Sequence, residues 1–485
     1  MEECSCLCVM GSSRGCRCRQ KRQRPAEMAA AEGKRDPAPT EKHMEVDPPH
    51  CSLQDLPVEM LVEIFASLPG TDLPSLALTC TKFHNILHID SIWRWRCREE
   101  FGICENLQNL EMIGLSYREV YAKLFHPYRH ILGLWQLDTE DYRTLLNVVV
   151  DGLCITGWTY GPWLNTYVDG PIQFEPAFRI RLTERKSATV ECMEGCHSRP
   201  HNRHMQIQKD RFTTQCSKTD HLKDLPRQLR DQWGRVLVQE DRQQYDCLAY
   251  RRLYLPPSHP DDLIRPGLFQ ANCNPYGLSI AMLSFHGKYA RVTKVTGITK
   301  ILALEIHLMR RIQLPNGEFF RNFNELSRVV QEIDEQVIRE QQQQQEDGTE
   351  DSEGHGWQSS AQQSVRESGV AASEEQPVPF VLPVGVHSRD HNYPGTCRMC
   401  FYGVDTATFT VNLYGFTDTR RYPGVFILFD ENHFGFIWSE VNYFILYRRV
   451  QNTFQNVEAP SPQAFLEMLK NIQYRPPGRS SLHAL

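Results

Sequence analysis

Residues 52–101 carry an apolar pattern that predicts a short bundle of helices. The first helix has apolar side chains at three- and four-residue spacing, which places them on one face: Leu56, Met60, Leu61, Ile64, Phe65 and Leu68. Asp55 can cap this helix, and Pro57 suits its first turn because a missing N–H is no loss there. Pro69 ends it. Two further helices are expected in this segment, and Trp93 anchors the last of them.

A bundle of this size cannot bury all its apolar surface alone, so exposed Leu or Phe side chains on it would mark a partner surface. One interpretation is a helical hairpin packed on a larger domain. The ordered string L-P-x-E-x-L-x-x-I-F and the late tryptophan outweigh it, and the segment resembles the F-box. That resemblance implies docking onto the Skp adaptor of a cullin–RING ubiquitin ligase. The docking surface would be formed or supported by Leu56, Pro57, Ile64 and Trp93.

The composition is that of an ordinary globular protein and excludes several classes of function. A formal net charge of -6 argues against general nucleic-acid binding. No apolar run reaches the ~18 residues that a membrane helix needs, and the first residues contain no apolar signal core. The 17 cysteines form no compact disulfide framework. In a chain without a secretion signal, reduced thiols or metal ligands are the better expectation.

After the helical region the pattern changes to short strands. Residues 102–135 keep helical spacing and predict a helical linker. The segment 145–156 predicts a hairpin with a tight turn at Asp151-Gly152. Many short apolar runs separated by Gly and Pro then favour an antiparallel barrel or sandwich. The expected fold class is α+β, with an N-terminal three-helix F-box and a helical linker before a mainly antiparallel β-barrel-like domain.

One segment interrupts the strand pattern. Residues 323–340 predict an amphipathic helix that runs into five glutamines. The residues that follow are acidic and rich in Ser, Gln and Gly, so they predict a disordered insertion. The expected division is a Cys/Arg-rich tail and linker (1–50), the F-box (51–101), the helical linker (102–135), the β domain in two parts (136–345 and 378–475, the second with a C-terminal helix), the insertion (346–377) and a tail (476–485).

A cluster of cysteines and histidines is the strongest local signal after the helical segment. Two Cys and two His around a strand hairpin can hold zinc tetrahedrally through sulfur and imidazole nitrogen. Cys192 with His201 could form one arm and Cys216 with His221 the other, with three substitutes nearby: Cys196, His197 and His204. The spacing is not that of a standard zinc finger, so a His-rich polar loop with incidental cysteines has equal weight. A catalytic zinc is disfavoured because no nearby pair of acids suggests a general base.

No other motif points to catalysis. The chain contains no Gly-rich phosphate loop, nucleophile elbow or HExxH sequence. Cys397 and Cys400 form a second thiol pair without an evident companion pair, which predicts reduced thiols at a strand turn. We therefore assign no catalytic residue, although nucleophilic chemistry by a Cys and a His that meet only in the folded chain stays open.

Several longer strings beyond the F-box are similar to one family. They are PYRHILGLWQ (127–136), HPDDLI (259–264), RNFNELSR (321–328), PFVLPVGV (379–386), CRMCFYG (397–403) and PGVFILFD (423–430). These strings resemble the F-box only protein 31 family, and the resemblance covers roughly residues 52–473.

This resemblance implies the substrate receptor of an SCF ubiquitin ligase, working with the Skp adaptor, cullin scaffold and RING subunit. The β domain would bind C-terminal segments of substrates such as D-type cyclins and direct their ubiquitination and proteasomal degradation, in cell-cycle arrest and the DNA-damage response. A structural zinc is also implied, with Cys192, His201 and Cys216 at the ligand positions and His221 at the fourth. The turn at 296–300 lacks an Asp-Pro-containing extension expected of the family. If that turn borders the substrate pocket, substrate preference is expected to differ.

Three hypotheses remain open on the sequence alone. The leading one is a non-catalytic ligase subunit that binds neither nucleic acid nor membrane. The second is a zinc-dependent hydrolase with an appended F-box-like hairpin, and the third is an F-box scaffold outside a ligase. We expect a cytoplasmic protein, with the centrosome and the nucleus left open as further locations.

Overall fold

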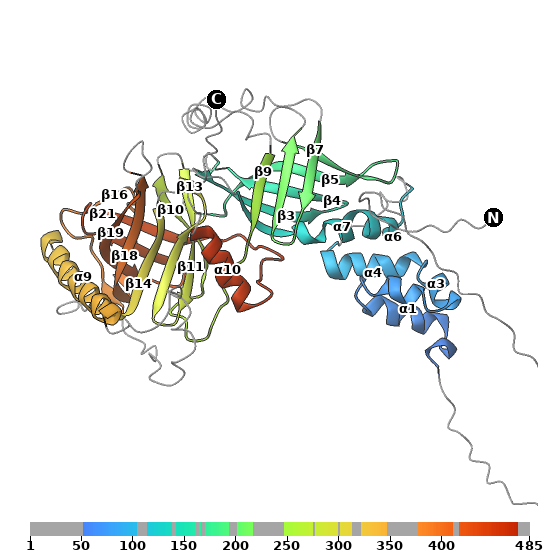
Figure 1. The fold of residues 1–485 in the computed structure, drawn as a ribbon, viewed down its shortest axis with the longest axis horizontal. Helices are drawn as coiled ribbons and strands as arrows, with labels where there is room; N and C mark the ends of the chain where they lie inside the picture. The colour runs from blue at the N-terminus through green and yellow to red at the C-terminus, as the bar shows by residue number, and fades with distance from the viewer. Residues whose placement is uncertain are drawn as a thin grey trace, which may run out of the picture. The chain divides into compact units, whose positions relative to one another are not determined.

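The computed structural model describes most of the chain from Ser52 onward, and its elements are labelled in Figure 1. The described residues are 52–103, 114–137, 142–161, 164–165, 170–193, 201–216, 247–274, 277–298, 301–312, 322–346, 377–410 and 417–473. The predicted tails at 1–50 and 476–485 lie outside them. No helix in the described part is long and apolar enough to cross a membrane.

The F-box region consists of four short helices: α1 (Val58–Ser67), α2 (Leu73–Ala77), α3 (Thr81–Ile86) and α4 (Asp90–Phe101). The second predicted helix is thus divided in two, because the Cys80 side chain accepts the Phe83 N–H and starts α3 anew. The cap predicted at Asp55 is wrong. Pro57 is the N-cap of α1, and Asp55 instead accepts the Ser52 N–H within its own 3-10 turn, η1 (Leu53–Asp55).

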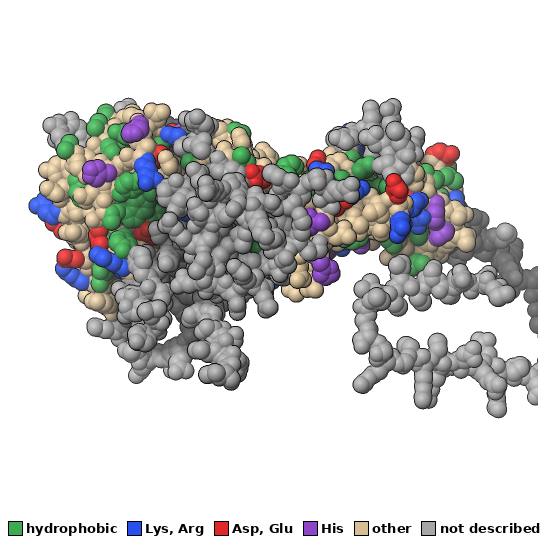
Figure 2. All heavy atoms as spheres, turned by 90° about the horizontal axis from the view of Figure 1, so that it is seen from above, with side chains coloured by type: hydrophobic (Ala, Val, Ile, Leu, Met, Phe, Trp, Pro, Cys, Tyr) green, Lys and Arg blue, Asp and Glu red, His purple; other side chains and the backbone are tan. Residues whose placement is uncertain are grey.

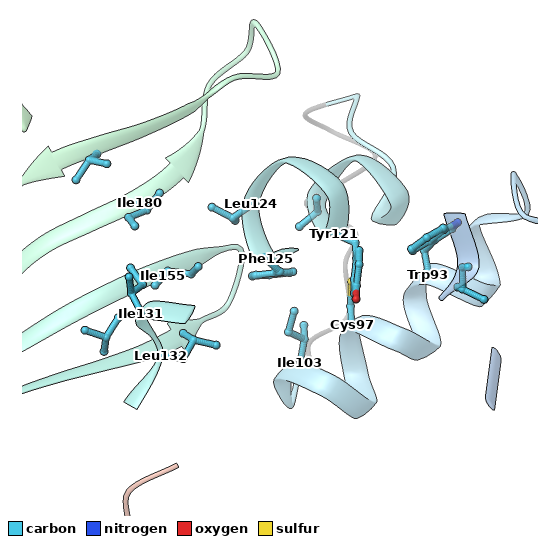
Figure 3. Close-up of a cluster of buried hydrophobic side chains, with 14 of the residues drawn as sticks. Trp93, Cys97, Ile103, Tyr121, Leu124, Phe125, Ile131, Leu132, Ile155 and Ile180 are labelled. Atoms are coloured by element: carbon cyan, nitrogen blue, oxygen red, sulfur yellow. The ribbon is translucent and has the colours of Figure 1, made fainter. Parts of the chain in front are cut away.

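A short helical segment leads from the F-box into the first barrel. It comprises α6 (Tyr117–Val120), η2 (Tyr121–Phe125), α7 (His126–Tyr128) and η3 (Arg129–Ile131). Ser116 and Glu119 form a capping box at its start, which satisfies two backbone N–H groups reciprocally. Leu124 and Phe125 point from η2 toward Ile180 of the first barrel (Figure 3). The predicted helical linker is therefore present from Tyr117 to Ile131, but its predicted end at residue 135 is wrong, because the first barrel strand already begins at Gly133.

The first barrel is a closed antiparallel ring. Its strands are β1 (Gly133–Leu137), β3 (Leu145–Asp151), β4 (Cys154–Tyr160), β5 (Phe174–Leu182), β6 (Ala188–Cys192), β7 (His201–Ile207), β8 (Arg211–Cys216) and β9 (Cys247–Leu253). The predicted turn between β3 and β4 is confirmed: Asp151 faces Cys154 across the hairpin, and Gly152 takes a positive φ. Trp135, Phe178 and Phe212 fill the centre with ring contacts.

The second barrel follows, and pairing of its first and last strands closes it. Its strands are β10 (Gly267–Asn274), β11 (Gly277–His286), β12 (Tyr289–Lys294), β14 (Ile301–Arg311), β18 (Met399–Thr410), β19 (Thr417–Leu428), β20 (His433–Trp438) and β21 (Tyr443–Arg449). Short additions are β15 (Val378–Pro379) with β17 (Thr396–Cys397), and β16 (His387–Ser388) beside β21. The sequence predicted one interrupted β domain. The structure has two barrels, because strand pairing rather than strand composition decides where a ring closes.

The two barrels contact each other through strands and a helix. The short strand β2 (Tyr142–Arg143) pairs with β13 (Gly297–Ile298). The buried Gln136 side chain donates to the Val295 carbonyl over 2.7 Å. The C-terminal helix α10 (Pro462–Gln473) inserts Phe465 and Leu469 into an apolar cluster shared by both barrels. The last helix predicted from the sequence is confirmed, and it contributes to this shared core.

The helix α9 (Phe323–Glu346) covers the outer side of the second barrel, as Figure 1 shows. Phe323, Leu326 and Val330 are buried against barrel residues, which confirms the apolar face predicted for this helix. One turn after Val330, Asp334 accepts hydrogen bonds from the Tyr402 hydroxyl and from Arg421. On the face shown in Figure 2, acidic and basic side chains are interspersed over the described surface.

The predicted insertion lies between α9 and β15, and residues 347–376 are outside the described part. Replacing them with a short Gly-Ser linker should change the unfolding free energy by less than about 1 kcal/mol, because loop-closure entropy varies only with the logarithm of loop length. Thermal unfolding of the purified protein and Skp-adaptor binding measure this. A large fall in melting temperature would show that the segment packs on the folded protein.

Candidate functional site

The four residues predicted for adaptor docking occupy different positions in the F-box region. Pro57 is exposed, Leu56 and Ile64 are half-buried, and Trp93 is buried. The Trp93 indole N–H donates to the Leu87 carbonyl over 2.7 Å, and its ring lies 5.1 Å from that of Tyr121. Trp93 can therefore support a docking surface but offers little surface to a partner.

Four apolar side chains of the F-box region that were not predicted to dock are also exposed. They are Val58, Met60, Leu78 and Trp95, of which Leu78 is 88% exposed. Exposed apolar side chains concentrated on one small bundle mark an interaction surface. Helical periodicity placed Met60 on the apolar face of the first helix, and it gave no position to Val58, Leu78 or Trp95. Their individual exposure depends on how α1, α2 and α4 pack.

Three predicted metal ligands meet at one end of the first barrel. Cys192 is the last residue of β6 and lies opposite His201, the first residue of β7. Cys216 ends the adjoining strand β8. The candidate ligand atoms of these residues lie within 4.8 Å of one another, and His201 Nε2 is 2.7 Å from Cys216 Sγ. Antiparallel pairing thus assembles the cluster from separate strand ends.

The donor set and its surroundings fit zinc. Zn–S bonds of ~2.3 Å and Zn–N bonds of ~2.0 Å place neighbouring ligand atoms about 3.3–3.8 Å apart, so small shifts would complete the geometry. Cys192 and Cys216 are buried. The buried Arg203 guanidinium donates to the Ala177 carbonyl at 3.2 Å and contacts Cys192 Sγ at 3.9 Å. A fixed cation beside the cluster offsets the negative charge that two thiolate ligands would carry.

The remaining predicted ligands do not join this cluster in the described part. His204 lies on β7, is exposed and faces Gln215 across the sheet. His221, Cys196 and His197 lie outside the described residues. The structure therefore brings together Cys192, His201 and Cys216 and leaves the fourth ligand a prediction.

A second group of polar side chains lies inside the second barrel. Every strand of the ring contributes to one apolar cluster, including Phe401 and Phe426, so this cluster is the barrel interior. Side chains two or four residues further along a strand share that side. Asp405, four residues after Phe401, is 3% exposed, and its Oδ2 accepts the Trp438 indole N–H over 3.1 Å. Its Oδ1 is buried and has no hydrogen-bond partner among the described residues.

Ser279 and Lys294 also face the barrel interior. Ser279 lies two residues before Ala281 on β11, Lys294 lies two residues after Val292 on β12, and both Ala281 and Val292 belong to the interior cluster. A Cβ atom placed on Gly297 would lie 3.5 Å from Lys294 Nζ and 3.6 Å from Ser279 Oγ, so the two groups border one space. Ser279 Oγ is buried without a hydrogen-bond partner in the described part. Burial raises the pKa of Asp405 to about 6, although Trp438 and Lys294 act to lower it. These groups can bind a polar or charged chain end.

Cys397 and Cys400 are both buried in the apolar cluster beneath α9. Burial and a hydrogen bond to Cys397 raise the pKa of Cys400, and the same bond lowers the pKa of Cys397. Of the residues that the structure describes, no histidine or carboxylate completes a metal cluster with them. Their position agrees with the predicted pair of reduced thiols at a strand turn.

Two parts of the chain match models of known protein families. An F-box-like model matches residues 53–99, and a cyclin D1 binding domain model matches residues 250–453. The second match spans the strands that form the second barrel. The chain thus combines an F-box-like domain with a cyclin D1 binding domain.

Curated relatives match nearly the whole length of the chain. F-box only protein 31 of Rattus norvegicus is 54% identical over 511 residues, covering 98% of this chain and 99% of the relative. The Mus musculus protein is 54% identical over 515 residues and the Homo sapiens protein 53% identical over 543 residues, with the same coverage. The chain therefore belongs to the F-box only protein 31 family.

Proposed function

We propose that this protein is the substrate-recognition subunit of an SCF ubiquitin ligase. The observation that carries the proposal is the presence of an F-box-like domain and a cyclin D1 binding domain in one chain. The F-box region would bind the Skp adaptor and thereby the cullin scaffold and its RING subunit. The second barrel would bind D-type cyclins and similar substrates. Because one chain holds both partners, ubiquitin transfer becomes effectively intramolecular. The effective concentration of the substrate near the ligase rises, and this chain need not catalyse any step.

The proposed biological role follows from this activity. Ubiquitination would direct substrates to the proteasome and serve cell-cycle arrest and the DNA-damage response. The protein would act in the cytoplasm, with the centrosome and the nucleus as further places of action. Zinc at Cys192, His201 and Cys216 would be structural and would tie the ends of three strands together.

An affinity pull-down from cells tests the ligase assignment. Full-length protein and a variant with an altered F-box are compared by mass spectrometry of the recovered proteins. Adaptor, cullin and RING subunit should disappear from the variant sample, while cyclin substrates persist. Recovery of the adaptor without any cullin would favour a scaffold outside a ligase instead.

We infer that the C-terminal segment of a substrate enters the polar end of the second barrel. The Lys294 ammonium can pair with a terminal carboxylate. Asp405 Oδ1 and Ser279 Oγ are buried without partners in the described part, which is a costly arrangement. Asp405 could accept a backbone N–H of the bound chain end, and the Ser279 hydroxyl could donate to its terminal carboxylate. Gly297, in the shortened turn, borders the same space, so this turn would affect substrate preference.

Asp405→Asn tests this site by separating stability from binding. An Asn oxygen can still accept the Trp438 N–H, but the buried charge is gone. The pKa of about 6 in the folded protein lies above the ordinary aspartate value of 3.8. Stability from the neutral carboxyl is therefore complete below about pH 4 and is lost as pH rises through 6. At pH 7 we expect unchanged or higher stability, by up to about 2–3 kcal/mol, and at least about tenfold weaker binding of a cyclin C-terminal peptide.

Thermal unfolding across pH 4 to 8 and calorimetric titration with the peptide measure the two effects. Glu440→Gln is the matched control, because Glu440 is an exposed carboxylate of the same barrel that pairs with Arg420. It should leave peptide binding unchanged. Equal peptide affinity for wild type and Asp405→Asn would exclude Asp405 from the binding site.

A further inference from the structure

Glu100, near the end of α4, joins three segments of the chain through one carboxylate. Its Oε1 accepts the backbone N–H of Gly70 over 2.7 Å, in the turn between α1 and α2. Its Oε2 accepts the Tyr121 hydroxyl over 2.7 Å, from η2. Arg96 lies 3.6 Å from Oε1 and also donates to the Leu68 carbonyl over 2.9 Å. The F-box helices and the helical linker therefore share one polar junction.

Gly70 approaches Tyr121 so closely that no side chain fits at position 70. A Cβ on Gly70 would lie 2.2 Å from the Tyr121 hydroxyl oxygen, so only glycine allows this approach. The Tyr121 ring is buried and lies 5.1 Å from the Trp93 ring and 5.8 Å from the Phe101 ring. Burial and the hydrogen bond to Glu100 both raise the pKa of Tyr121, so the hydroxyl stays protonated and keeps donating.

The linker continues these contacts into the first barrel. Figure 3 shows Tyr121 facing the α4 side and Phe125 and Leu124 facing the strands that carry Ile155 and Ile180. On the surface, the Lys186 ammonium in the β5–β6 turn lies 2.9 Å from a Glu119 oxygen. Apolar packing thus holds η2 both to the barrel and to α4, where Phe101 stacks on Phe125 at 4.9 Å. Glu100 and Gly70 add the polar connection from η2 to the α1–α2 turn.

We propose that Glu100, with Gly70 and Tyr121, is a positioning group that fixes the F-box against the first barrel and thereby sets where a bound substrate lies in the ligase. This inference rests on the proposed ligase function. Proximity raises a reaction rate only when the connection between the two binding sites holds the reactants in a productive orientation. A more flexible connection populates many orientations, so the productive one is occupied for less of the time. Loosening the junction should therefore slow ubiquitin transfer without weakening either binding surface.

Three variants loosen the junction by different means. Tyr121→Phe removes only the hydroxyl and keeps the ring packing. Glu100→Gln leaves a single acceptor oxygen where the carboxylate serves both Gly70 and Tyr121. Gly70→Ala forces the Tyr121 side chain away. Two matched controls alter residues outside the junction. Tyr117→Phe changes a tyrosine of α6 whose ring lies beneath Arg94 of α4, and Glu99→Gln changes the exposed residue that precedes Glu100 on α4.

The first measurement needs no ligase activity. Spin labels attached through non-natural amino acids at the exposed positions 85 and 184, on α3 and in the β5–β6 turn, report the distance distribution in the full-length protein, measured both alone and with the Skp adaptor added. Wild type and both controls should give one narrow distribution. The three variants should broaden it, with Gly70→Ala broadest because it forces a steric change as well as breaking the bond.

The second measurement is ubiquitination of a bound cyclin by the assembled ligase, with adaptor and substrate affinities determined in parallel. We expect roughly three- to tenfold slower transfer for the variants at unchanged affinities. Narrow distributions and wild-type rates in all three variants would overturn the inference. A wild-type complex that neither binds adaptor nor modifies cyclin would sink the ligase assignment instead, while the distance measurement still decides whether Glu100 fixes the two parts.

Discussion

Cys216→Ala should remove zinc from the purified protein and lower its melting temperature by about 5–10 °C. The expected loss is ~2–3 kcal/mol, and 1 kcal/mol shifts the midpoint by about 2–4 °C in a chain of 150–250 residues. Metal binding would contribute to folding here, because the predicted ligands lie at the ends of β6, β7 and β8. Substrate binding should weaken only indirectly, and adaptor binding should not change. Elemental analysis and thermal unfolding measure the two effects.

Cys154→Ala is the matched control for this prediction. Cys154 is a half-buried thiol at the start of β4 in the same barrel, and it is not one of the clustered ligands. It should keep full zinc content and nearly wild-type stability. Less than about half an equivalent of zinc in wild-type protein purified without chelator would count heavily against the site. Zinc whose removal abolished a hydrolytic activity but left stability unchanged would overturn the structural role.

The proximity of Cys192, His201 and Cys216 was predictable because it depends mostly on short-range features. Cys192 and His201 flank one hairpin, and Cys216 ends the next strand, so antiparallel pairing alone brings them together. The polar group inside the second barrel was not predictable in this way. Ser279, Lys294 and Asp405 come from three strands, and their meeting depends on register and ring closure, which strand composition does not encode.

The F-box region illustrates the same limit at shorter range. Its amphipathic first helix and the buried Trp93 follow from residue spacing. The role of Glu100 does not follow from residue spacing, because a single glutamate near a helix end is typical of a solvated surface charge. Its function depends on Gly70 and Tyr121 arriving from turns and helices on either side of it. Contacts between elements, rather than the elements themselves, are what the sequence leaves open.

Replacing Leu56 and Pro57 together with Ala should abolish recovery of the cullin and leave both barrels folded. Pro57 is the exposed N-cap of α1, and the Leu56 carbonyl accepts the Lys82 ammonium over 2.9 Å, so the pair fixes the start of the helix as well as its surface. A few apolar anchors dominate such interfaces, each worth about 2 kcal/mol or more. Adaptor affinity should therefore fall at least about tenfold. Binding of the purified adaptor, and cullin recovery from cells, measure the loss.

Leu78→Ser separates docking from folding in the same region. Because Leu78 is 88% exposed, its removal should leave the melting temperature unchanged while weakening adaptor binding if the exposed apolar group is part of the docking surface. Val441→Ser is the control, since Val441 is an exposed apolar residue of the second barrel. It should leave adaptor binding intact. Unchanged cullin recovery with the Leu56 and Pro57 double variant, in protein that is folded, would refute docking through this surface.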